Sequence, residues 1–235
     1  MGRRTDIYGG KDPRLLPFYS FTEAALCLRI PVITLRQWTL GRGYPTKTGD
    51  RVSRPLITAA DPGRRLLSFV NLLEGQALRA FRNEHGLRLS VIRAALASLE
   101  VLDGDAAKAH PLAFEQFLTD RLDIFVERVG QLITLNPARQ IAIREAFRND
   151  LKRIQRDETG PVALFPWVGG EWLSGTPVTI NPRVGFGRPT VTGTGISTAV
   201  LASLVRAGES VDSVAEDYVL SIDQVTAAIR FEEAA

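Results

Sequence analysis

Apolar residues recur at helical spacing along most of the chain, which predicts a mostly α fold with short β elements. Near the N-terminus, Ser20 and Glu23 have the S-x-x-E spacing of a capping box, and the Ala-Ala-Leu-Cys-Leu run behind them favours a short packed helix. Pro31 breaks this helix and is well placed to begin a second one over about 32–40. Two short helices joined by a tight break are typical of a helix-turn-helix.

The residues that follow are typical of a wing. A turn is expected at Gly49 and Asp50, between β-tolerant residues, and Leu56 with Ile57 can close a strand. The tripeptide Asp61-Pro62-Gly63 predicts another turn. A short hairpin directly behind the second helix is therefore expected.

Two longer amphipathic helices come next. Apolar residues recur every three to four positions over 66–81, and this helix is expected to end near Gly86. Ser90 is expected to cap the following helix. We therefore predict a winged-helix DNA-binding domain at residues 16–104, preceded by a flexible arm at residues 1–15.

Residues 105–170, in the middle of the chain, are expected to form a mixed α/β segment that connects the two terminal units or mediates dimerisation. Two β-like runs lie within 123–134, although the apolar spacing there also fits a helix. A helix is expected after Asn136-Pro137, and an apolar stripe from Ile141 to Ile154 suits it to dimerisation. A strand is expected at 162–167.

Residues 171–235, the last unit of the chain, are expected to form a three-helix domain that resembles a helix-turn-helix. Glycine-rich turns flank a short strand at 190–192, and Ser210 and Ser221 are expected to cap two of the helices. The helices are expected at about 198–207, 211–218 and 222–232.

The net charge of +3 is an average over two unlike ends. Residues 1–65 hold 12 Lys and Arg against 5 Asp and Glu, residues 66–170 hold 13 against 13, and residues 171–235 hold 4 against 8. A basic N-terminal unit favours nucleic acid, whereas an acidic C-terminal unit repels phosphates and suits a protein partner. A solubilising or dimerising role is the alternative for the acidic unit.

Signals for catalysis are weak, and we expect no enzyme, no metal site and no cofactor. His85 and His110 are isolated, and neither has a neighbour at metal-ligand spacing. Cys27, the one cysteine, is expected to be a small buried thiol. The longest apolar stretch is about five residues and the start lacks an apolar signal core, so a soluble cytoplasmic protein is expected.

The signal for DNA binding is stronger. A recognition helix needs polar or basic side chains on its outer face to read base edges, and cations nearby to hold phosphates. The base-reading candidates on the second helix are Thr34, Arg36 and Gln37. The phosphate-binding candidates are Arg29, Arg42, Lys47, Arg51 and Arg54.

Two stretches resemble known families. The string from Ser20 to Ala25, the Thr34-Leu-Arg-Gln-Trp38 segment and the helices behind the wing resemble, over residues 17–102, the winged-helix domain of MerR-type regulators. That resemblance implies that Thr34 and Arg36 contact DNA and that Trp38 lies on the adjoining packed or phosphate-facing surface. Residues 178–232 look like a small helical domain of unknown function that is common in antitoxins encoded beside PIN-like nuclease toxins.

The whole layout resembles the long, VapB-like antitoxins of bacterial type II toxin–antitoxin pairs. The resemblance implies a homodimer that binds operator DNA of its own operon and neutralises a PIN-type ribonuclease toxin. In the short VapB antitoxins an arginine can enter the acidic metal site of the toxin, and Arg206 or Arg230 would be the candidates here. The alternative is a stand-alone MerR-like transcription regulator whose C-terminal domain dimerises.

Overall fold

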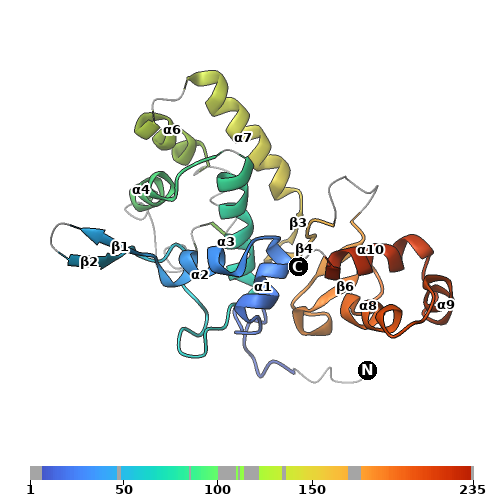
Figure 1. Ribbon diagram of the computed structural model, residues 1–235. Coiled ribbons are helices and arrows are strands. Elements are labelled where there is room, and N and C mark those ends of the chain that lie inside the picture. Colours follow the sequence, from blue (N-terminus) through green and yellow to red (C-terminus); the bar gives the residue numbers. More distant parts are fainter. Residues whose placement is uncertain are drawn as a thin grey trace.

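The structure is a computed structural model that describes residues 7–46, 49–84, 86–99, 110, 112–113, 122–133, 136–168 and 176–233 (Figure 1). The wing projects from one side, and the hairpin of α6 (Leu122–Ile133) and α7 (Pro137–Leu151) rises above (Figure 1). The C-terminal helices lie on the opposite side and are α8 (Thr198–Arg206), α9 (Val211–Asp217) and α10 (Ile222–Glu233). The expected mostly helical fold, with a helix-turn-helix at the N-terminus and a small helical domain at the C-terminus, is confirmed.

The helix-turn-helix forms as its caps predict. Helix α1 (Phe21–Leu28) begins at Ser20, whose hydroxyl accepts from the Glu23 amide while the Glu23 carboxylate accepts from the Ser20 amide. Helix α2 (Val32–Leu40) begins directly after Pro31. The two reciprocal hydrogen bonds satisfy amides that the first turn of a helix leaves free.

The wing is an antiparallel hairpin of β1 (Gly43–Thr46) and β2 (Gly49–Val52). Gly49 pairs with Thr46, and Asp50 pairs with Pro45, so the prediction of a turn at Gly49 and Asp50 is wrong. The closing strand at Leu56 and Ile57 is also wrong, because their amides donate to the Trp38 carbonyl instead. The turn at 61–66 is confirmed by the bridge between Asp61 and Leu66.

The helices behind the wing build the main core. They are α3 (Phe69–Arg79), which continues into one π-helical turn (Ala80–Glu84), α4 (Leu89–Leu99), α6 (Leu122–Ile133) and α7 (Pro137–Leu151). Helix α3 begins at Phe69, after the cap residue Ser68, and not at residue 66. Ser90 lies inside α4 rather than capping it. Over the described residues 123–133 the β-like runs are wrong and the helical alternative is confirmed. The buried positions Leu122, Phe125, Val126 and Val129 follow the 3.6-residue repeat of a helix that packs on α4.

A four-stranded antiparallel sheet crosses from the middle of the chain into the C-terminal unit. Its order is β3 (Ile154–Asp157), β4 (Gly160–Leu164), β5 (Val178–Ile180) and β6 (Pro189–Val191). Leu164 pairs with Ile180, which joins the strands on either side of residue 171. The expected apolar stripe from Ile141 to Ile154 therefore ends early, because Ile154 lies in β3.

The C-terminal helices are α8 (Thr198–Arg206), α9 (Val211–Asp217) and α10 (Ile222–Glu233). The expected caps are confirmed: the Ser210 hydroxyl accepts from the Ser213 amide, and Ser221 and Gln224 form a capping box. Helix α10 packs on α8 and α9, and it also contacts β5 and β6.

One apolar core runs from Tyr19 to Ile180 and includes side chains of α6 and α7. The rings of Phe81 and Phe125, for example, lie with their centroids 4.5 Å apart. The segment predicted to connect two domains thus packs into the same core as the helix-turn-helix. A separate cluster fills the space between α8, α9 and α10.

The N-terminal arm is more ordered than predicted. The Arg14 carbonyl accepts from the Val70 amide, and the Arg14 guanidinium pairs with Asp12 at 2.7 Å and donates to the Thr159 carbonyl. The Tyr8 hydroxyl donates to the Pro182 carbonyl at 2.8 Å. The expectation of a loose arm is therefore wrong for residues 7–15. None of the described helices is both long enough and apolar enough to cross a membrane.

A strained valine predicts a stabilising substitution. Val219, between α9 and α10, has φ of 54° and a side chain that is 91% exposed. A β-branched residue rarely adopts this left-handed conformation, and glycine does so freely. We expect Val219→Gly to raise the free energy of unfolding by about 0.5–1 kcal/mol, measured by urea denaturation. The control Val200→Gly, in the first turn of α8, should lower it; no gain for Val219→Gly would contradict the strain.

A buried carboxyl predicts a pH dependence. Glu74 on α3 lies 3.1 Å from His110 Nδ1 and 3.0 Å from Asn71 Nδ2, and its burial raises its pKa above 4.5. A raised pKa favours the folded state at low pH, and this contribution is lost as pH rises through the folded pKa. We therefore expect Glu74→Gln, which cannot ionise, to gain stability relative to the wild type as pH rises above about 4.5. Urea denaturation at several pH values measures this difference, and parallel pH profiles of the two proteins would contradict it.

Candidate nucleic-acid interface

Helix α2 is held firmly against the core, which fixes the face that it presents outward. Leu35 and Trp38 are fully buried, so Trp38 belongs to the packed surface. The amides of Leu56 and Ile57 donate to the Trp38 carbonyl at 2.7 and 3.1 Å, and the Thr39 hydroxyl donates to the Leu35 carbonyl. The two bonds to Trp38 satisfy a carbonyl that the end of the helix leaves free, and they tie α2 to the chain behind the wing.

The outward face of α2 carries the expected polar residues and two apolar ones that the sequence reading missed. Arg36 is exposed and Gln37 is half-buried next to it, whereas Thr34, which is also half-buried, lies two residues before Arg36 and points to another side of the helix. Ile33 and Leu40 are 61% and 44% exposed and lie on the same face, at spacings of three and four residues from Arg36. An exposed isoleucine on such a face can contact a thymine methyl group. The sequence signal for this role was an apolar residue among polar neighbours on the second helix.

The wing adds cations beside this helix. Arg51 lies in β2 opposite Tyr44 of β1, and both are exposed, as is every residue of β2. Arg42 is exposed at the base of the wing, where its amide donates to the Ser53 hydroxyl. Arg54 is exposed and its carbonyl accepts from Arg93. Lys47 lies outside the described residues.

Arg29 does not belong to this surface, although it was predicted as a phosphate contact. Its Nε donates to the Trp167 carbonyl at 3.1 Å, its Nη2 donates to the Phe231 carbonyl at 2.5 Å, and its guanidinium lies 4.3 Å from the centre of the Phe231 ring. Burial lowers the pKa of Arg29, and the guanidinium is turned toward the C-terminal helix. The spacing of the residues gave no sign of this long-range contact.

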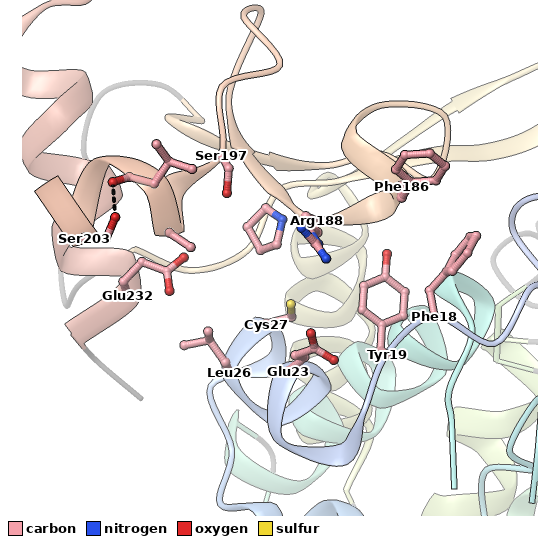
Figure 2. A pocket seen from close by; sticks show the side chains of 13 residues that line it. Phe18, Tyr19, Glu23, Leu26, Cys27, Phe186, Arg188, Ser197, Ser203 and Glu232 are labelled. Atoms are coloured by element: carbon pink, nitrogen blue, oxygen red, sulfur yellow. Dashed lines mark hydrogen bonds between the residues drawn. The ribbon is translucent and has the colours of Figure 1, made fainter. Parts of the chain in front are cut away.

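A cleft of about 470 Å³ separates α1 from the C-terminal helices (Figure 2). Leu26 and Cys27 of α1 line one wall, Ser197 and Glu232 line the other, and Arg188 lies between them. The Glu232 carboxylate accepts a hydrogen bond from the Thr198 hydroxyl. The Glu23 carboxylate accepts one from the hydroxyl of Ser20, the cap residue of α1. The two carboxylates are thus engaged in structural hydrogen bonds.

Among the described residues, the candidates for other chemistry do not assemble into a site. Burial raises the pKa of the Cys27 thiol to about 12, which makes it a poor nucleophile. His110 pairs with Glu74, and His85 lies outside the described residues. Within the described part of the chain no three His, Cys, Asp or Glu side chains gather as metal ligands. Arg206 and Arg230 are both exposed, in the last turns of α8 and α10.

Comparisons with known proteins match both ends of the chain. A family described as "Putative DNA-binding HTH domain" matches residues 17–96, and one described as "Protein of unknown function (DUF433)" matches residues 178–231. The first contains α1, α2, the wing, α3 and most of α4, and the second contains β5, β6, α8, α9 and most of α10.

Relatives cover nearly the whole chain. It is 28% identical over 232 residues to "Putative antitoxin VapB45" of Mycobacterium tuberculosis, which covers 91% of this chain and 93% of the relative. It is 24% identical over 221 residues to the uncharacterized protein Rv2308 of the same organism, covering 91% and 89%. The crystal structure of Rv2018 from Mycobacterium tuberculosis has the same fold, with a TM-score of 0.64 at 24% identity over 91% of this chain and 98% of that one. The chain is thus similar to a helix-turn-helix family near its N-terminus, to the DUF433 family near its C-terminus, and to VapB45 along most of its length.

Proposed function

We propose that the protein is an antitoxin, not an enzyme, which binds operator DNA of its own operon and neutralises a PIN-type ribonuclease toxin by direct binding. The observation that carries this proposal is the likeness to a named antitoxin over both ends of the chain. The exposed basic face of α2 and the wing supports the DNA-binding part, because groove reading needs polar side chains on a helix that the core holds in place.

In this proposal α2 enters the major groove with Arg36 toward base edges, and the wing follows the backbone with Arg51. The cations Arg42 and Arg54 then lie near phosphates on either side. A helix of nine residues reads only a few base pairs, so two copies are expected to bind paired half-sites as a homodimer. Light scattering of the purified chain measures the state of association, with a dimer expected and a monomer at all concentrations as the contrary result.

The acidic C-terminal helices are the proposed surface for the toxin. The exposed carboxylates of α9 and the turns around it are Glu209, Asp212, Glu216 and Asp217. Such a surface favours a partner with basic residues at its rim. Arg206 and Arg230 are the cations of these helices that can reach an acidic nuclease site, and single Ala substitutions test them by the residual ribonuclease activity of the complex.

The DNA-binding part is tested by mobility shift with the duplex upstream of the chain's own reading frame. We expect a specific shift that excess unrelated DNA does not remove, with the full chain rather than a fragment. Deleting the first 103 residues is a poor control, since they share one core with the residues behind them. Point substitutions on the exposed face are better, because they leave the core intact.

The wing predicts a non-specific contribution to binding. We expect Arg51→Ala to weaken binding to operator and unrelated DNA by similar factors and to lower the slope of log affinity against log salt by about 0.9, as one phosphate contact is lost. Fluorescence anisotropy at several salt concentrations measures both quantities. The matched control is Arg183→Ala, which removes an exposed cation of the C-terminal unit; an equal change of slope there would contradict the placement of Arg51.

A further inference from the structure

The turn of the helix-turn-helix contains an arginine in an unusual conformation. Arg29 ends α1 with φ of 54° and ψ of 46°, where glycine is the usual residue. Its amide donates to the carbonyls of Ala25 and Leu26, so the main chain of the turn is fixed. A glycine would fit this backbone without strain, so the side chain of Arg29 is the part of the residue that needs a reason.

That side chain joins the turn to the last helix of the chain. Two of its nitrogens, Nε and Nη2, donate to the carbonyls of Trp167 and Phe231, and the guanidinium lies over the Phe231 ring. A planar guanidinium can make two directed hydrogen bonds and a ring contact at once, which a lysine ammonium cannot. The contact therefore fixes both the distance and the orientation between the turn and α10.

Two neighbouring contacts also join α1 and the residue before its cap to the C-terminal unit. The buried Tyr19 hydroxyl donates to the Gly187 carbonyl at 2.8 Å, and Gly187 has φ of 77° and no room for a Cβ beside that hydroxyl. Leu26 packs into a cluster with Val178 and Phe231. Only two residues, Ile30 and Pro31, lie between Arg29 and the first residue of α2, so α10 is held close to the start of the helix that faces the DNA.

We infer that Arg29 is a positioning residue, through which the C-terminal unit sets the placement of α2 on DNA. The inference rests on the proposed DNA binding and deepens it by naming how that site is regulated. Loss of the Arg29 contact frees the turn from α10 and lowers DNA affinity, although no phosphate contact is lost. A partner that moves α10 acts on DNA binding by the same route.

The test measures affinity and salt slope of the full chain with its upstream duplex by fluorescence anisotropy. We expect Arg29→Ala to weaken binding roughly tenfold, within the range seen for residues that couple distant sites, with an unchanged salt slope. Arg29→Lys should restore little of the affinity. Phe231→Leu removes the ring beside the guanidinium but keeps both carbonyl acceptors, so it should weaken binding less than Arg29→Ala does. The double variant should bind no more weakly than Arg29→Ala, because that substitution already removes the ring contact.

The opposite results overturn the inference. A salt slope lower by about 0.9, with recovery in Arg29→Lys, would make Arg29 a phosphate contact. Additive losses in the double variant would show that Arg29 does not act through Phe231. Equal weakening by Val214→Ala, which removes buried atoms from the separate cluster of α8 to α10, would indicate general destabilisation instead.

A second measurement keeps the inference testable if Arg29→Ala fails to fold. Amide hydrogen exchange of the Arg29→Lys chain is expected to rise over residues 32–40 and to stay unchanged over α4; unchanged exchange in α2 would overturn the inference. Absence of specific binding by the wild-type chain would instead overturn the proposed DNA binding, and the role of Arg29 with it.

Discussion

Arg36→Ala is expected to weaken specific operator binding by about 1–3 kcal/mol while leaving binding to unrelated DNA much less affected. Arg36 is exposed on the outward face of α2, and the other face of this helix is anchored by Leu35 and Trp38. A bidentate contact of arginine with a guanine edge carries sequence information, so its loss relaxes specificity at one base pair. Competition titrations with operator variants measure this.

Two substitutions make the Arg36 result interpretable. Arg36→Lys keeps the positive charge but loses the planar guanidinium. We therefore expect this variant to lose more of its preference for the operator than of its affinity for unrelated DNA. Arg183→Ala removes an exposed cation far along the sequence and should change neither. If Arg36→Ala weakens operator and unrelated DNA equally, Arg36 holds a phosphate and does not read a base.

Trp38→Ala is expected to lower the free energy of unfolding by about 3–5 kcal/mol, and with it operator binding. Trp38 is 1% exposed, and its carbonyl accepts from both Leu56 and Ile57. Removing the ring leaves a cavity under α2 at the point where the helix is tied to the chain behind the wing. Urea denaturation gives the loss of stability, and anisotropy gives the loss of binding.

The conservative variant Trp38→Phe should retain most of the stability and most of the binding, since it keeps an aromatic ring in the same space. A loss below about 1 kcal/mol for Trp38→Ala would mean that Trp38 lies on an open, phosphate-facing surface. The resemblance to MerR-type regulators allowed Trp38 to lie either on a packed surface or on a phosphate-facing one. The loss of stability in Trp38→Ala distinguishes these two positions.

The local elements of the fold could be predicted because their signals are local. Ser20 and Glu23 form the predicted capping box, Ser210 and Ser221 cap their helices, and Pro31 precedes α2. Each depends on residues three or four apart, so the chain itself brings them together. The outward placement of Arg36 followed from the same helical periodicity.

What could not be predicted depends on contacts between distant segments. The strand pairing of Leu164 with Ile180 and the contact of Arg29 with Phe231 join residues that no spacing relates. The helix at 122–133 was ambiguous for the same reason, since its packing on α4 decides between two periodicities. The charge of Arg29 suggested DNA, and only its packing against α10 removes it from that surface.

Inhibition of the toxin tests the central claim most directly. The nuclease encoded next to this chain's reading frame is purified, and its ribonuclease activity is titrated with the full chain at micromolar concentration. We predict that the activity falls to background at a fixed stoichiometric ratio, in a complex that also co-purifies. Full nuclease activity in the presence of excess chain, with no complex, would contradict the assignment of this protein as an antitoxin.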